Sequence, residues 1–236
     1  MASLESVQAK VARAKQHYIA LTSQLNWYFQ GKGCDLLLEA NLQTNTVRVA
    51  GIEAPAIPTV IPLIIGDCLQ NLRSALDYLV WELVLAANNK PNKNHAFPIC
   101  GSPKCFENAK ARGRLNGIDA RAVALIEALQ PYRAGEGRKK ETGLWILDEL
   151  CNINKHRRIL LTELTSGFLL DGEAVPQHYA KVTAASGEDM EMDANIVALV
   201  VFNEGVVKGA DVCSVLDQIA REVWENIAPL FAPFFE

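Results

Sequence analysis

Residues 62–87, PLIIGDCLQNLRSALDYLVWELVLAA, decide the fold of this chain. Apolar side chains recur every three or four positions along this stretch, as they do on one face of an α-helix. Pro62 fits the first helical turn, and the segment Asn88-Asn89-Lys90-Pro91 ends the pattern. The sequence therefore predicts an amphipathic helix from Pro62 to about Ala87, with an apolar face of Ile65, Leu69, Leu72, Leu76, Leu79, Val80 and Leu83.

The opposite face of this helix carries a continuous polar stripe. Its members are Asp67, Asn71, Ser74 and Tyr78, with Gln70, Asp77 and Trp81 beside them. Arg73 and Asp77 are four residues apart, which allows them to form an ion pair along the helix. A stripe of this kind is often a solvated face. Tyr78 and Trp81, however, are aromatic residues with polar tips, and they are more typical of a cleft or an interface.

Further helices and strands are predicted on both sides of this segment. Residues 3–30 form a helix with a narrow apolar seam of Leu4, Val7, Val11, Ala14, Tyr18, Leu21, Leu25 and Tyr28. A seam of this length requires a partner helix. Asp119 and Asp211 can cap two later helices, and residues 88–117 are expected to be an irregular connection. Runs rich in β-forming residues predict a hairpin at 34–50 and strands at 159–165, 178–184 and 195–203.

These elements predict an α+β fold, a bundle of long helices with an N-terminal β-hairpin and a C-terminal antiparallel sheet followed by a final helix. We expect a single domain over residues 1–236, with a helical part at about 1–157 that includes the hairpin at 34–50. The strand-rich part is expected at about 158–236. Adjacent strands without crossover helices favour the antiparallel arrangement.

Composition narrows the class of protein. Hydrophobic residues make up 50% of the 236 residues and charged residues 21%, which excludes a disordered or collagen-like chain. The formal charge is −4, so no global basic field indicates a nucleic acid or an anionic membrane as the partner. Neither a signal peptide nor an uninterrupted apolar span is apparent, and we expect a cytoplasmic protein without a membrane partner. The six cysteines include no Cys-x-x-Cys pair, and we expect neither a metal nor a cofactor.

The charge is distributed unevenly along the chain. Residues 104–158 carry 12 Lys and Arg against 7 Asp and Glu, a net charge of 12 − 7 = +5. Residues 159–236 carry 3 against 13, a net charge of 3 − 13 = −10. Opposite charges on two parts of one chain can fix the orientation of subunits or partners.

A second polar row lies on the predicted helix that begins at Leu144. Trp145, Glu149, Asn152 and His156 share one face of this helix, and Lys155, Arg157 and Arg158 flank its end. A glutamate in line with a histidine can tune an imidazole for acid–base work, and the flanking cations can hold a phosphate or another anion. Cations in a last helical turn also suit the helix dipole, so a purely structural role stays open.

Together the stripe and the row define a candidate site if the two helices face each other across one cleft. Its catalytic residues would be His156 as the acid or base, Glu149 orienting it, and Asp77. Its ligand-binding residues would be Asp67, Asn71, Arg73, Ser74, Asn152, Lys155 and Arg157.

Four motifs carry a resemblance to known proteins. They are Asn71-Leu-Arg-Ser-Ala-Leu-Asp-Tyr78, Phe97-Pro-Ile99, Leu129-Gln-Pro-Tyr132 and Asn152-Ile-Asn-Lys-His-Arg157. With these motifs the chain resembles a family of uncharacterised bacterial and phage-borne proteins. More distantly, the Arg73 helix and the Lys155-His156-Arg157 cluster resemble the HEPN ribonucleases, which are dimeric helical proteins that cut RNA. The arginine-then-histidine spacing of those enzymes does not occur here.

Two functions are compatible with these patterns. The first is a non-enzymatic interaction or assembly module that forms a homodimer through its long helices. The second is a protein that binds a phosphate-containing ligand or RNA. For this second function, the resemblance to the HEPN ribonucleases implies a ribonuclease built on His156. A buried cleft around His156 would favour the second function, and the stripe of residues 67–78 inside a subunit interface would favour the first.

Overall fold

The computed structural model describes residues 2–31, 35–41, 46–156, 160, 162–170, 180–181 and 194–236, with side chains at 2–30, 51–155, 160, 162–165 and 198–236. The fold is α+β, as the sequence predicts. Its first half consists of α1 (Glu5–Gly31), the strands β1 (Asp35–Asn41) and β2 (Thr46–Glu53), and α2 (Val60–Ala86). The second half contains α3 (Pro103–Ala111), α4 (Ala120–Ala128), α5 (Gly143–His156), β3 (Thr162–Leu170), β4 (Ala180–Lys181), β5 (Ala194–Phe202) and α6 (Val212–Arg221).

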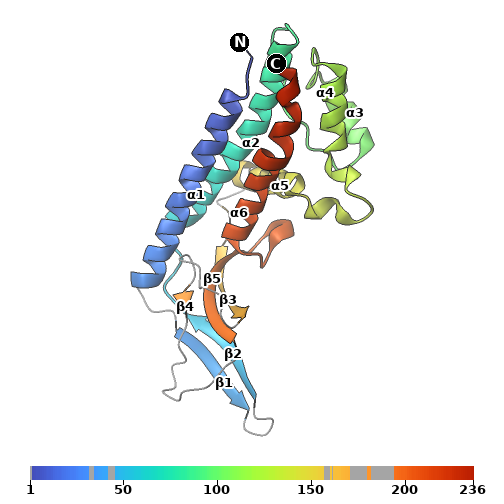
Figure 1. The fold of residues 1–236 in the computed structure, drawn as a ribbon. Coiled ribbons are helices and arrows are strands. Elements are labelled where there is room, and N and C mark those ends of the chain that lie inside the picture. The colour runs from blue at the N-terminus through green and yellow to red at the C-terminus, as the bar shows by residue number, and fades with distance from the viewer. Residues whose placement is uncertain are drawn as a thin grey trace.

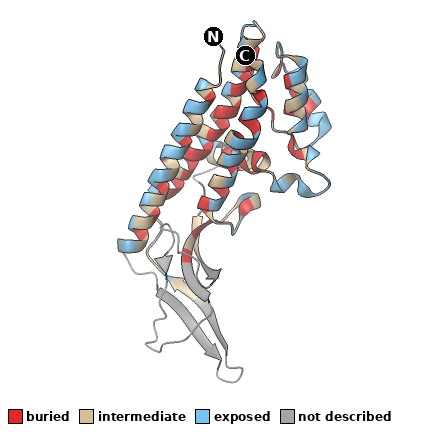
Figure 2. Cartoon of the chain, in the orientation of Figure 1, coloured by how far each residue is buried: buried red, intermediate tan, exposed pale blue. Residues whose placement is uncertain are grey.

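The helices α1, α2 and α6 lie side by side, and α5 packs against α2 and α6 (Figure 1). Buried residues occur along the full length of α2, as the colours of Figure 2 show. All seven residues of the predicted apolar face of α2 are buried. Burial of this continuous face stabilises the helix far more than its intrinsic propensity does.

The apolar seam of α1 is also buried within the chain. Val7, Ala14, Leu21, Leu25 and Tyr28 are each at most 4% exposed and belong to the same core as α2. The partner helix that this seam requires is therefore supplied by the chain itself. A second subunit is not needed to cover it.

The strands form two antiparallel sheets. β1 and β2 make a hairpin with a register shift between Leu37 and Leu38, and the second sheet has the order β3-β5-β4. Both arrangements agree with the antiparallel pairing expected from the sequence. In Figure 1 the strands lie beyond one end of the helical bundle, away from the chain termini.

Residues 88–117 are only partly the irregular connection that the sequence analysis predicts. Ser102 caps α3 by accepting a hydrogen bond from the Cys105 N–H at 3.3 Å, and Pro103 occupies the first helical turn. This segment contains many polar residues, so its composition indicates a loop. Ser102-Pro103 is nevertheless a common helix start, with serine as the N-cap and proline in the first turn. The other two predicted caps are confirmed: Asp119 accepts from Arg121 N–H and Asp211 from Ser214 N–H, both at 2.8 Å.

Candidate functional site

The outer face of α2 carries a line of exposed and half-buried side chains that runs the whole length of the helix. At 100° per residue its members lie within about 80° of one another. We refer to them as the α2 stripe: Val60, Leu63, Asp67, Asn71, Ser74, Tyr78, Trp81 and Leu85. Other sides of the helix pack against α1, α5 and α6.

The α2 stripe is apolar at both ends and polar in the middle. Its five large apolar residues, Val60, Leu63, Tyr78, Trp81 and Leu85, are between 39% and 51% exposed. Single exposed apolar residues are normal on a protein surface, but a row of five on one helix face is not. Tyr78 and Trp81 are the two residues from which the sequence predicts a cleft or an interface on this face. Val60, Leu63 and Leu85 were not part of that prediction, although they continue the same helical spacing in both directions.

A hollow of about 430 Å³ lies beside the C-terminal half of the stripe. It is lined by Ser6, Asp77, Tyr78, Trp81, Glu82 and His95. Glu82 accepts hydrogen bonds from Ser3 N–H at 3.2 Å and from Ser6 Oγ at 2.9 Å, which fixes the start of α1 against α2. Lys10 Nζ lies 5.4 Å from the centre of the Tyr78 ring, within the range of a cation–π contact. The hollow is therefore walled by aromatic rings and by groups that hold α1 in place.

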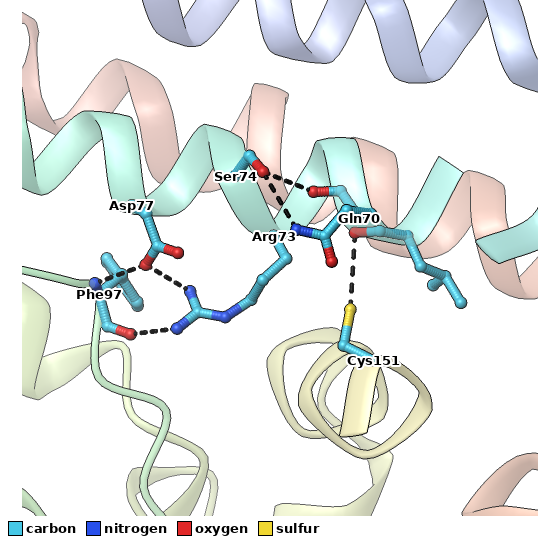
Figure 3. Close-up of polar contacts among 7 residues, drawn as sticks. Gln70, Arg73, Ser74, Asp77, Phe97 and Cys151 are labelled. Carbon is cyan, nitrogen blue, oxygen red and sulfur yellow. Dashed lines mark hydrogen bonds and ion pairs between the residues drawn. The ribbon is translucent and has the colours of Figure 1, made fainter. Parts of the chain in front are cut away.

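Arg73 and Asp77 bind the segment around Phe97 to α2 (Figure 3). Arg73 Nη2 donates to the Phe97 carbonyl at 2.8 Å, and Asp77 Oδ1 accepts from the Phe97 N–H at 2.9 Å. Arg73 Nη1 lies 3.0 Å from Asp77 Oδ1, an ion pair whose angle is poor for a hydrogen bond. Arg73 is 9% exposed, so its charge is held inside the protein and needs these partners.

The environment of Asp77 raises its pKa. Burial is the main cause, because it disfavours the charged carboxylate. The positive charge of Arg73, the Phe97 N–H and the charge of Lys155 act in the opposite direction and are outweighed. Asp77 is thus a fixed structural acceptor, with Lys155 of α5 near enough to act on it.

Helix α5 crosses α2 on the side opposite to α1. Cys151 Sγ donates to the Leu69 carbonyl at 3.6 Å (Figure 3), and a Cβ on Gly66 would lie 2.7 Å from Asn154 Nδ2. Position 66 has no room for a larger residue because α5 passes directly over it. Burial raises the pKa of the Cys151 thiol to about 12. The charge of Arg73, which lies on the same side of α2, acts on this thiol in the opposite direction.

The side chains of the predicted row on α5 contact three different parts of the protein. The Trp145 ring lies against Gly101, where a Cβ would be 2.6 Å from ring atom Cζ3, and Lys139 Nζ is 5.3 Å from its centre. A Cβ on Gly205 would lie 3.5 Å from Glu149 Oε1, so Glu149 reaches the connection between β5 and α6. Asn152 is exposed and donates to Asp148 Oδ2 at 3.0 Å.

The structure does not fully describe two residues of the predicted site at the end of α5. His156 ends α5, but its side chain is not among the described side chains, and Arg157 lies outside the described residues. The predicted pairing of His156 with Glu149 therefore stays a prediction. Lys155 is exposed.

The polar middle of the α2 stripe bonds within its own helix and toward α1. Asn71 Nδ2 donates to the Asp67 carbonyl at 2.9 Å, and Ser74 Oγ donates to the Gln70 carbonyl at 2.8 Å. Asp67 Oδ2 is 4.0 Å from His17 Nδ1 of α1. The structure thus brings Arg73, Asp77 and Lys155 to one side of α2 and places Asp67, Asn71 and Ser74 on its outer face.

No protein-family model matches this chain, and comparisons with curated proteins and with solved structures give no match either. Within the described part of the chain, no helix is both long enough and apolar enough to span a membrane. The same part of the chain contains no group of three or more His, Cys, Asp or Glu residues placed to hold a metal ion.

Proposed function

We propose that this chain is a non-enzymatic, cytoplasmic assembly module, and that its α2 stripe binds a second copy of the chain. The observation that supports this function is the row of large apolar residues at both ends of one exposed helix face. Exposed apolar surface of this kind costs free energy in water. That free energy is recovered when a second surface covers it.

The apolar seam of α1 does not contribute to this proposal, because its residues are buried inside the chain. Self-association must therefore use a different surface. The α2 stripe has the length of α2, about 40 Å at 1.5 Å per residue, which is enough for a helix–helix interface.

Sedimentation equilibrium of the wild-type chain and of Leu63→Glu tests this function. Leu63 is 51% exposed, so the substitution adds a charge to the stripe without disturbing the core. A charge at the centre of an apolar contact acts twice in a symmetric dimer, and we expect the dimer to weaken by at least about 100-fold.

The matched control is Leu230→Glu. Leu230 is 44% exposed and belongs to the C-terminal segment Ala228–Phe234, not to the α2 stripe. If both variants self-associate like the wild type, or if the wild type is a monomer at all concentrations, this function is wrong.

A second proposal is binding of an anionic ligand or RNA, with a HEPN-like cleavage centred on His156. It is supported by the net positive segment 104–158, in which Arg138, Lys140 and Lys155 are exposed. Titration of a fluorescent single-stranded RNA tests it, since binding through these cations must weaken steeply with salt. If Lys140→Glu and Lys155→Glu leave the RNA affinity unchanged, or if no binding occurs at low salt, this role is excluded.

A further inference from the structure

The order of residues along the α2 stripe defines how the two copies would pair, and this inference rests on the proposed self-association. We propose that two α2 helices pack antiparallel about a two-fold axis that passes between Leu72 and Arg73. In a two-fold interface each contact occurs twice, so a suitable stripe must be complementary to its own reversed sequence.

The α2 stripe has this property. In the proposed register, the numbers of two residues that face each other add up to 145. Val60 then faces Leu85 of the second copy, Asp67 faces Tyr78, and Asn71 faces Ser74. Val60 and Leu85 thus form an apolar pair, and Trp81 faces Ile64. Leu63 faces Glu82, which lines the hollow beside Trp81. Each residue of the polar middle meets a hydrogen-bonding partner.

Charge favours the antiparallel orientation over the parallel one. A parallel pair would place Asp67, whose side chain is 62% exposed, opposite Asp67 of the second copy. In the antiparallel pair Asp67 instead meets the Tyr78 hydroxyl. Lys10, whose Nζ lies 5.4 Å from the Tyr78 ring centre, is then carried toward the same carboxylate. Each Asp67 therefore gains a donor and a nearby cation.

The shape of the stripe supports the same register. The hollow of about 430 Å³ lies beside Tyr78 and Trp81, on the C-terminal side of the axis. Leu63, the most exposed apolar residue of the stripe, is on the N-terminal side at nearly the mirrored position of Trp81. An antiparallel pair therefore places Leu63 of each copy at the mouth of the other copy's hollow, as a knob enters a hole.

The available surface is sufficient for a modest but stable contact. Exposed fractions near 40–50% on five large apolar side chains leave on the order of 400 Å² of apolar surface per chain. The two copies together, with the polar middle of each stripe, then approach the roughly 1,200 Å² at the lower limit of specific interfaces.

Distances between nitroxide labels distinguish the orientations. Thr59 and Gln70 are both exposed, at the start and near the middle of α2, and each is replaced by cysteine in a Cys34→Ser/Cys105→Ser background. Along the helix axis, the antiparallel register separates the two Gln70 positions by about 8 Å and the two Thr59 positions by about 40 Å. A parallel pair brings both positions within about 20 Å.

Each outcome is decisive when the particle mass of the labelled variants is measured in parallel. A dimer with close Gln70 labels and distant Thr59 labels supports the register. A dimer in which both label pairs are close, or both are distant, overturns the register and leaves self-association standing. A monomeric mass for the unlabelled wild type overturns the proposed function itself.

A second, independent inference concerns Cys100 and Cys105. Their sulfur atoms lie 2.7 Å apart, Cys100 is buried and Cys105 is exposed at the start of α3. We infer that this pair is a reversible redox site that exchanges with a small disulfide such as oxidised glutathione. Burial and the neighbouring thiol raise the pKa of Cys100 to about 12, so the attacking thiolate must come from the accessible Cys105.

The exchange is balanced without any further reactant. The Cys105 thiolate attacks one glutathione sulfur, breaks the glutathione S–S bond and releases one glutathione thiolate. The Cys100 thiol then loses its proton and attacks Cys105 Sγ, which releases the second glutathione. Two protein thiols are oxidised to one disulfide, and one glutathione disulfide is reduced to two glutathiones.

Intact-mass spectrometry of the folded protein with oxidised glutathione tests this site. We expect a loss of about 2 Da that dithiothreitol reverses, and a stable glutathione adduct on Cys105 in the Cys100→Ser variant. A wild-type chain that keeps a glutathione adduct, or that does not react at Cys105, would overturn the inference. Peptide mapping after alkylation identifies the two linked residues.

Discussion

Replacing Arg73 by Met tests whether the contacts of α2 with Phe97 are structural. The substitution keeps the buried stem of Arg73 but removes the guanidinium, which donates to the Phe97 carbonyl and lies 3.0 Å from Asp77 Oδ1. A lost hydrogen bond to a charged group costs about 1.5–3 kcal/mol. Breaking a buried ion pair costs about 3–5 kcal/mol, but the Asp77 side chain is 37% exposed, which reduces that cost. We therefore expect Arg73→Met to lower the free energy of unfolding by about 2–4 kcal/mol.

Urea unfolding at pH 7 measures this change, with Arg121→Met as the matched control. Arg121 forms an ion pair of the same kind with Asp119 at 2.8 Å, but its side chain is 81% exposed. Solvent screens such a pair, and we expect no measurable loss of stability in the control. The double variant Arg73→Met/Asp77→Asn should cost less than the two single changes added together, because they share partners. If Arg73→Met is as stable as Arg121→Met, the structural role of this network is wrong.

Three further predictions concern other contacts. Glu222 accepts from Gly143 N–H at 2.8 Å and Leu144 N–H at 3.2 Å, so Glu222→Ala should lower stability by about 0.5–2 kcal/mol in urea, whereas the exposed Glu225→Ala should not. Gly101→Ala places a Cβ 2.6 Å from the rigid Trp145 ring and should cost about 1–3 kcal/mol. Adding Trp145→Leu should recover part of that loss, and no recovery would mean that the ring is not the obstacle. For Asp77, whose pKa is raised, the folded state holds its proton to higher pH than the unfolded state does. Raising the pH above about 4 therefore lowers the free energy of unfolding through this group. The stability of the wild type relative to Asp77→Asn should fall as the pH rises. A constant difference between the two proteins would contradict the raised pKa of Asp77.

The fold is readable from the sequence where one periodicity dominates. The apolar spacing in α2 identifies its buried face correctly, and Asp119 and Asp211 mark two helix starts. The short helix α3 was missed because its nine residues include only two buried ones, so apolar spacing carries little signal there. Its start depends on Ser102, whose single hydrogen bond is a local signal.

The candidate site is less readable, because a helical wheel does not show which neighbour covers which side. Arg73 and Asp77 share a helix with Asp67 and Ser74, yet they turn toward Phe97 while the others lie on the outer face. The partner of Arg73 is a backbone carbonyl 24 residues away, which no side-chain pattern identifies. The predicted function of the polar residues on α5 depends on His156, whose side chain lies outside the described part of the chain.

The most direct test of the central claim is the particle mass of the wild-type chain by light scattering over a range of concentrations. Self-association through the α2 stripe predicts a mass that rises from 25.9 kDa toward twice that value as the concentration increases. A mass that remains at 25.9 kDa up to about 100 µM, far above the dissociation constants of ordinary specific dimers, would contradict the assembly function.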